Sequence, residues 1–204
     1  MTETVVPGLP GVTLHPGDHV CAFYRGRDER EHILRSFLGE GLAAEDKLIC
    51  VVESVSPGQI GDLLGAPAKP AVESGALEVL TPEQTYLRSG HFKMVAMLDY
   101  WREGVETALA DPRFSFVRII AEMPLALTTI ADLDEFMCYE SAINRFAVQH
   151  PQVIVCLYDL ERFGGAVLID VLRTHPVVLL GGAVLDNPYY LEPDHFLASR
   201  KRVS

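Results

Sequence analysis

Short apolar runs typical of buried strands alternate with amphipathic helical stretches along most of this chain. The strand-like runs are His19–Phe23, Leu48–Val52, Leu77–Leu80, Phe116–Ala121, Val153–Tyr158 and Val177–Leu180. Helical periodicity begins near Asp28 and Pro57 and then covers Phe92–Leu109, Leu133–Val148 and Gly165–Leu172. Such an alternation is typical of parallel strands joined by helices that cover both faces of a sheet. It predicts an α/β fold of three layers, with a mostly parallel central sheet between helices.

The loop between the first strand and the first helix lacks the residues that bind phosphate. A phosphate-binding loop needs several glycines to open backbone N–H groups toward the anion, a Lys for the outer phosphates, and a Ser or Thr for magnesium. The segment Phe23–Glu31 contains Gly26 but no Lys, Ser or Thr. We therefore interpret the chain as a nucleotide-hydrolase scaffold without the parts that hydrolyse nucleotides. We expect no ATP cofactor and no enzymatic activity.

The length and the net charge of the chain limit its domain organisation and its possible binding partners. The 204 residues can bury one sizeable core, so we expect a single domain over residues 14–193, with an N-terminal extension at 1–13 and a C-terminal tail at 194–204. The 28 acidic and 17 basic residues give a formal charge of −11, which argues against nucleic acid or an anionic membrane as the direct partner. No apolar run approaches the roughly 18 residues of a membrane span, and the start lacks the regions of a signal peptide. We expect a cytoplasmic protein.

Two histidines and two cysteines form the first candidate site. His19 and Cys21 point to the same face of their strand, because side chains alternate with period two. Cys156 lies in another strand, and His175 follows a helix in a loop fixed by Pro176. Two imidazoles and two thiolates suit zinc or another borderline-soft metal, provided that all four converge. The alternative for each cysteine is packing in the core, because cysteine is among the most often buried residue types.

Carboxylates form the second candidate site. Glu122 ends a predicted strand, and Glu140 falls on the apolar stripe of the helix predicted from Leu133. A buried carboxylate must be paired, hydrated or shifted in pKa, because burying an unpartnered charge costs several kcal/mol. Arg118 is the nearest candidate partner in the sequence. A structural network of Arg118, Glu122 and Glu140 and a role in ligand binding are both open at this point.

Seven short segments, in order along the chain, carry a resemblance to a known family. They are His19–Cys21, Phe37–Leu42, Arg118–Met123, Tyr139–Glu140, Cys156–Asp159, Thr174–Pro176 and Asn187–Tyr190. Over roughly Leu14 to Pro193, the chain resembles the MEDS domain, the methanogen/methylotroph DcmR sensory domain. The resemblance implies a degenerate relative of the RecA/KaiC-type ATPases that has lost the phosphate loop and senses small hydrocarbon derivatives. It also singles out His19, Cys21, Cys156 and His175 as a set.

Three functions are compatible with these observations, and a sensory role is the leading hypothesis. The chain would be a non-catalytic sensor that binds a small organic ligand, with or without a metal such as zinc. It would signal through a separate regulatory protein, such as a kinase, an anti-sigma factor or a DNA-binding protein. The alternatives are a residual nucleotide-binding ATPase and a structural module that assembles with copies of itself.

For a sensor, we expect the pocket at the C-terminal edge of the sheet, in the volume that a phosphate loop would give to ATP. Open parallel sheets bind their ligands at that edge. The predicted ligand-binding residues combine both candidate sites with two tyrosines, whose hydroxyl groups suit a small polar ligand. They are His19, Cys21, Tyr24, Arg118, Glu122, Glu140, Cys156, Tyr158 and His175.

Overall fold

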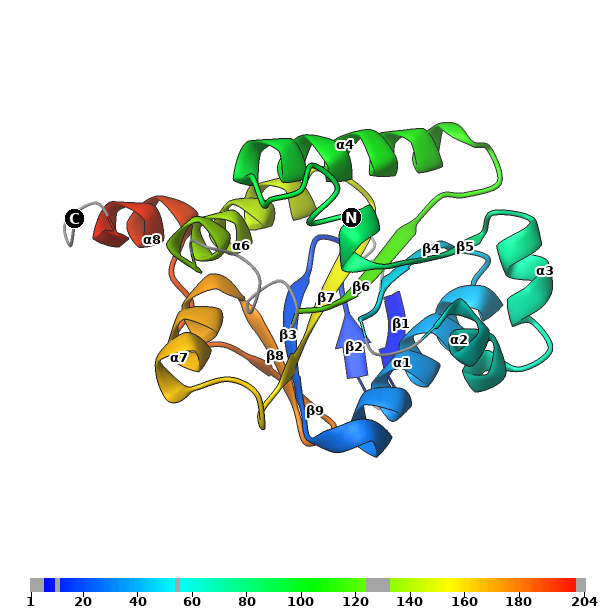
Figure 1. The fold of residues 1–204 in the computed structure, drawn as a ribbon, viewed down its shortest axis with the longest axis horizontal. Helices are drawn as coiled ribbons and strands as arrows, with labels where there is room; N and C mark the ends of the chain where they lie inside the picture. Colours follow the sequence, from blue (N-terminus) through cyan, green and yellow to red (C-terminus); the bar gives the residue numbers. More distant parts are fainter. Residues whose placement is uncertain (1–5, 10–11, 54–55, 124–132, 201–204) are drawn as a thin grey trace.

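A seven-stranded sheet lies at the centre of the molecule (Figure 1). The computed structural model describes residues 6–9, 12–53, 56–123 and 133–200. In the order β5-β4-β6-β7-β3-β8-β9, all neighbouring strands are parallel except β8 and β9. The strands are β3 (His19–Tyr24), β4 (Lys47–Val51), β5 (Leu77–Leu80), β6 (Val117–Glu122), β7 (Gln152–Asp159), β8 (Val177–Leu180) and β9 (Ala183–Asp186). The predicted mostly parallel sheet is confirmed.

Helices cover both faces of the sheet, which confirms the predicted three layers (Figure 1). On one face lie α1 (Gly26–Ala43), α2 (Pro57–Leu64) and α3 (Ala68–Glu73). On the other lie α4 (Met94–Ala110), α6 (Leu133–Ala147), α7 (Gly165–Thr174) and α8 (Pro193–Arg200). A short 3-10 helix, η1 (Pro82–Gln84), precedes α4. None of the helices in the described ranges is long and apolar enough to cross a membrane.

Successive residues of each central strand belong to different cores, because side chains alternate across a sheet. Cys21 and Cys156 pack into the core under α4, α6, α7 and α8. Their neighbours Ala22 and Val155 pack into the core under α1, α2 and α3. Every residue of β3, β4 and β6 is buried, as expected of strands covered on both faces. The parity of a residue number along each strand therefore decides which helices its side chain meets.

Three segments differ from the sequence-based expectation. Ala68–Glu73 forms α3 where prolines predicted a loop; Pro70 falls in the first turn, where its missing N–H costs no helical hydrogen bond. Part of the expected N-terminal extension pairs as the hairpin β1 (Val6–Leu9) and β2 (Val12–Leu14). Residues 194–200 of the expected tail form most of α8, whose Phe196 is buried in the core with α6 and α7. The remaining residues of the two terminal segments lie outside the described ranges.

Candidate functional site

Four ionisable side chains converge in the core beneath α6 and α7. His19, Glu140, Cys156 and His175 each offer one ligand atom, and these four atoms lie within 4.8 Å of one another. All four residues are almost fully inaccessible, with exposed fractions of 0%, 1%, 3% and 0%. Below, these four residues are called the His–Cys–Glu cluster. Because ionisable groups are costly to bury, a cluster of this kind inside an otherwise apolar core needs an explanation.

Each member of the cluster comes from a different element. His19 begins β3, and Cys156 lies within β7, whose neighbour in register on β3 is Cys21. Glu140 projects from the middle of α6. His175 follows the last residue of α7 with extended backbone, as is usual for a residue that precedes a proline. Residues far apart in the sequence are thus held together by the pairing of β3 with β7 and by the packing of two helices.

The ligand atoms of the cluster lie at short and similar separations. His19 Nε2 is 3.4 Å from Cys156 Sγ and 3.6 Å from Glu140 Oε2. His175 Nε2 is 3.2 Å from the same carboxylate oxygen. The two imidazole rings lie with their centroids 4.0 Å apart. Both rings therefore turn their Nε2 atoms toward one common point beside Glu140.

Hydrogen bonds at Nδ1 fix the tautomer of both histidines. His175 Nδ1 lies 2.8 Å from the Val171 carbonyl, which can only accept, so this nitrogen carries the proton. His19 Nδ1 lies 3.1 Å from Asn144 Oδ1. The amide nitrogen of Asn144 donates to the Thr174 carbonyl at 2.7 Å, which sets the orientation of the amide and makes its oxygen an acceptor. In their neutral forms, both rings present an unprotonated Nε2 to the cluster.

Burial favours the neutral forms of two cluster members. Burial lowers the pKa of His19 well below its ordinary value, and the neighbouring His175 lowers it further. Burial also raises the pKa of the Cys156 thiol well above its ordinary value, and the Glu140 carboxylate adds to this shift. Tyr158 donates its hydroxyl to Glu140 Oε2 at 3.3 Å. The cluster is thus a closed polar site in which any charge must be balanced from within.

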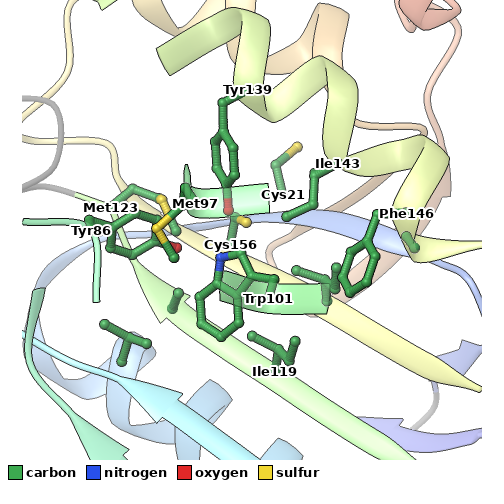
Figure 2. Packing of buried hydrophobic residues seen from close by; sticks show 14 of the residues in the cluster. Cys21, Tyr86, Met97, Trp101, Ile119, Met123, Tyr139, Ile143, Phe146 and Cys156 are labelled. Atoms are coloured by element: carbon green, nitrogen blue, oxygen red, sulfur yellow. The ribbon is translucent and has the colours of Figure 1, made fainter. Parts of the chain in front are cut away.

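Aromatic and sulfur-containing side chains pack beside the cluster. Figure 2 shows Cys156 among residues that include Tyr86, Met97, Trp101 and Tyr139, all buried in the same core. Burial raises the pKa of Tyr86 and of Tyr139 well above the ordinary value, so both hydroxyl groups stay protonated. The surroundings of Cys156 are therefore polarisable and mostly apolar, with two neutral hydroxyl groups.

Cys21 does not join the cluster, although it was predicted to do so. Its side chain lies on the same face of the sheet as His19 and Cys156, as the alternation required. Its thiol, however, is directed at the Val177 carbonyl at a distance of 3.6 Å. Glu140 takes the fourth place in the cluster instead. The strand period correctly predicted which face of the sheet Cys21 occupies. The packing of α6 against that face, however, makes Glu140 the fourth member of the cluster.

Three of the predicted ligand-binding residues lie on the opposite face of the sheet. Tyr24, Arg118 and Glu122 occupy even-numbered positions of β3 and β6, and in these two strands the even-numbered positions face α1 and not α6. The expected network of Arg118, Glu122 and Glu140 is therefore wrong, because the sheet separates Glu140 from the other two. The expected single pocket at the C-terminal edge is wrong for the same reason. His19 lies at the first residue of β3 and Cys156 in the middle of β7, so the cluster lies away from the C-terminal edge.

Arg118 forms a buried ion pair with Asp46. Its Nε donates to Asp46 Oδ2 at 2.7 Å, and its guanidinium lies over the Phe37 ring at 5.6 Å from the centroid. The exposed fraction of Arg118 is 0%. This arrangement anchors the start of β4 under α1 and serves the fold.

Glu122, which is buried at the C-terminal end of β6, forms a second ion pair with the partly buried Arg30. Its Oε2 accepts the backbone N–H of Glu53 at 2.8 Å, and its Oε1 lies 3.4 Å from Arg30 Nε. Burial raises the pKa of the nearby Tyr24, and the carboxylate of Glu122 adds to the shift. At the edge where a nucleotide hydrolase binds phosphates, this chain thus carries a carboxylate paired with an arginine of α1.

The first turn of α1 combines two acidic residues with one arginine, Arg27. The helix begins at Gly26 with Asp28 and Glu29 in its first turn, and its N-cap residue Arg25 makes no side-chain capping bond. An open pocket of about 480 Å³ beside this turn is lined partly by the same two acids and by His32. Carboxylates at a helix N-terminus occupy the place that a bound phosphate would take.

Asn144 is a site residue that the sequence-based prediction missed. It orients His19 through its oxygen, while its nitrogen donates to the carbonyls of Ser141 and Thr174 at 3.0 and 2.7 Å. The available signal was its position one turn after Glu140 on the apolar face of the same helix. Two polar residues one turn apart on an apolar helix face, Glu140 and Asn144, indicated a buried polar site there.

The fold is that of the RecA/KaiC-type ATPases. A KaiC-like protein from the hyperthermophilic archaeon Pyrococcus horikoshii superposes with a TM-score of 0.62 at 8% sequence identity, covering 86% of this chain and 78% of that chain. The flagellar accessory protein FlaH from Methanocaldococcus jannaschii superposes with a TM-score of 0.52 at 12% identity, covering 82% and 75%. At such identities the likeness concerns the fold alone. No curated protein matches the sequence.

Residues 18–176 match the family described as the methanogen/methylotroph, DcmR sensory domain, abbreviated MEDS. The match spans most of the 204 residues, so the chain belongs to the MEDS family. The resemblance inferred from the seven sequence segments is thereby confirmed. The description of the family assigns it a sensory role.

Proposed function

We propose that this chain is a non-catalytic sensory domain that binds a small organic molecule beside the His–Cys–Glu cluster. In this proposal the molecule is a simple hydrocarbon derivative, and the signal passes to a separate regulatory protein. The observation that carries the proposal is the cluster itself, which places four ionisable groups in the core of a member of a sensory family. Replacing buried polar groups by apolar ones is often neutral or stabilising, so their presence in a core supports a use beyond folding.

The surroundings of the cluster favour a ligand that is small and mostly apolar. Met97 and Trp101 supply thioether and aromatic contacts, while the neutral hydroxyl groups of Tyr86 and Tyr139 supply polar partners for one functional group. The site is closed, so a ligand must displace side chains or shift α6 relative to the sheet. Binding would then change the conformation of the elements that hold the cluster, and a sensor requires such a coupling.

The Arg30–Glu122 ion pair and the two carboxylates in the first turn of α1 support the absence of catalysis in this proposal. A nucleotide has no backbone cradle there, and its phosphates would meet Asp28 and Glu29. Open parallel sheets commonly bind ligands at the C-terminal edge of their strands, so residual nucleotide binding is kept as the second candidate.

Thermal denaturation with a panel of ligands tests the proposal. Purified protein is heated with small alcohols, aldehydes, halocarbons and organic acids at millimolar concentrations. A ligand that binds only the folded protein raises the melting temperature, since at a hundred times its Kd it adds about 2.7 kcal/mol of stability. We expect at least one class to do so in the wild type and in Cys50→Ser, whose thiol is buried on the opposite face.

The matched variants are Cys156→Ser and His175→Ala, which we expect to abolish the shift. A complete absence of shifts in the wild type across the panel contradicts the proposal. If Cys156→Ser and His175→Ala respond to the ligand like the wild type, the binding site lies elsewhere.

A further inference from the structure

We propose that the His–Cys–Glu cluster is a zinc site, with His19 Nε2, His175 Nε2, Cys156 Sγ and a carboxylate oxygen of Glu140 as its four ligands. The proposal goes beyond the sensory function, since it follows from the geometry of these residues whatever molecule the domain senses. It differs from the set expected from the sequence by one residue, with Glu140 in the place of Cys21.

The orientation of the two rings is the first argument. Each histidine uses Nδ1–H in a hydrogen bond to an oxygen outside the cluster, Asn144 Oδ1 or the Val171 carbonyl. Metal-binding histidines almost always have such a partner, which holds the ring and leaves the other nitrogen free to coordinate. His175 Nε2 is fully buried and has no hydrogen-bond partner among the described residues. A lone pair that faces a carboxylate oxygen at 3.2 Å requires a proton or a metal cation between the two atoms.

The separations between ligand atoms are the second argument. Around tetrahedral zinc, with bonds of about 2.0–2.3 Å, two nitrogen or oxygen ligands lie about 3.4 Å apart and a nitrogen and a sulfur about 3.6 Å apart. The two Nε2–Oε2 separations are 3.2 and 3.6 Å, and the Nε2–Sγ separation is 3.4 Å. Three of the six separations therefore match the edges of a zinc tetrahedron to within a few tenths of an ångström, and all four ligand atoms lie within 4.8 Å of one another.

Charge and ligand type are the third argument. A Cys156 thiolate and a Glu140 carboxylate carry two negative charges, and one divalent cation neutralises both in a site with exposed fractions of 0–3%. Imidazole with thiolate suits zinc better than the oxygen-seeking cations, magnesium and calcium. Four protein ligands without an open position are typical of a structural zinc site. Such an ion would join β3, β7, α6 and the end of α7 at one point.

The competing arrangement contains a proton and no metal. Cys156 S–H can donate to His19 Nε2 at 3.4 Å, and a protonated Glu140 can donate to His175 Nε2 at 3.2 Å. Both arrangements fit the same atoms, so a measurement of metal has to separate them.

Elemental analysis of the full chain as purified, followed by cobalt substitution, makes this measurement. We expect about one zinc per chain. After removal of zinc with a chelator, Co²⁺ should give the visible bands of tetrahedral cobalt and a near-ultraviolet charge-transfer band from the thiolate. Added Zn²⁺ should remove these bands and raise the melting temperature, because the ion binds the folded chain.

Two conservative variants decide which ligands are used. In Glu140→Gln and Cys156→Ser we expect zinc affinity to fall at least about 100-fold, more than the loss of an outer partner causes. The charge-transfer band should also vanish in Cys156→Ser. The matched control is Cys21→Ser, which removes the neighbouring thiol of the same face and should keep the metal, the band and the affinity.

Two results overturn the proposal. A wild-type protein that holds no zinc, binds no Co²⁺ and shows no thermal shift with Zn²⁺ carries the proton-bridged cluster. A Cys21→Ser variant that loses the metal while Glu140→Gln retains it restores the ligand set expected from the sequence. The wild-type cobalt spectrum decides the first point even if a variant fails to fold. Repeating the organic ligand panel on chelator-treated protein separates a failed zinc site from a failed sensor.

Discussion

At the scale of single residues, Glu140 holds the cluster together. Its carboxylate oxygen Oε2 lies within reach of both histidines and accepts the hydroxyl of Tyr158. Tyr158 is itself fully buried and packs edge-on against His175, with ring centroids 5.7 Å apart. The hydroxyl of Tyr158 therefore donates a hydrogen bond to Glu140, while its ring packs in the core.

Removing this hydroxyl tests whether Glu140 is a charged acceptor. We expect Tyr158→Phe to keep the ring contacts and to lower the free energy of unfolding by about 1.5–3 kcal/mol, the usual contribution of a hydrogen bond to a charged group. Urea denaturation measures the change. The control, Tyr189→Phe, alters a ring that is 68% exposed and should stay within about 0.5 kcal/mol of the wild type. Equal stability of Tyr158→Phe and the wild type would show that Glu140 does not depend on this donor.

The sequence predicted the cluster only in part, for a physical reason. His19, Cys156 and His175 were predicted together from their residue types, from the period of the strands and from the family resemblance, all of which can be read from the sequence. Glu140 was predicted as a site residue from its place on an apolar stripe, but not as a member of this set. Its selection over Cys21 depends on how α6 is rotated against β3 and β7, which is a long-range property of packing.

At the scale of elements, the contact between α1 and the sheet is unusually close at Gly41. A Cβ atom added there would collide with Leu48 and would lie 2.8 Å from Cδ of Arg118. Arg118 cannot easily move aside, because it is fully buried and paired with Asp46. The glycine is therefore needed for space, and the backbone of α1 approaches the sheet through it.

Two alanine substitutions in the same helix test this interpretation. Gly41→Ala should lower the free energy of unfolding by about 1–3 kcal/mol, the usual cost of overpacking a core. Gly39→Ala should raise it by up to about 1 kcal/mol, because alanine favours the helix and nothing lies within 4 Å of the added atom. Chemical denaturation of both variants compares the two effects. A Gly41→Ala variant as stable as Gly39→Ala would mean that Leu48 and Arg118 yield without cost.

Most of the strands and helices were predicted from the sequence, but the helices α3 and α8 were not. Strands β3, β4 and β7 are apolar runs with polar residues only at their ends, and covered parallel strands have this character. In contrast, α3 begins in a proline-rich stretch, and the low amphipathicity of α8 hides the burial of Phe196. Both helices bury residues against neighbouring elements, and the local sequence pattern does not predict such long-range contacts.

At the scale of the whole molecule, the sheet separates two groups of ionisable residues. On the α1 face, the edge that an ATPase of this fold uses for phosphates carries the Arg30–Glu122 pair and two carboxylates in the first turn of α1. On the α6 face, away from that edge, lies the His–Cys–Glu cluster. The loss of the phosphate loop was evident in the sequence, but the position of the second site was not, because the pairing of β3 with β7 and the packing of α6 define it.

This separation predicts that nucleotides bind weakly or not at all. Mg²⁺–ATP would bring its phosphates against Asp28 and Glu29 at a turn without a glycine cradle, in a chain of formal charge −11. Isothermal titration calorimetry should detect no binding tighter than about 1 mM, a standard free energy of about −4.1 kcal/mol. Inorganic phosphate, titrated under the same conditions, controls for a bare anion site. Saturable binding of ATP below that limit, accompanied by release of phosphate, would instead establish the residual ATPase, and the Arg30–Glu122 pair would then have to open to admit the nucleotide.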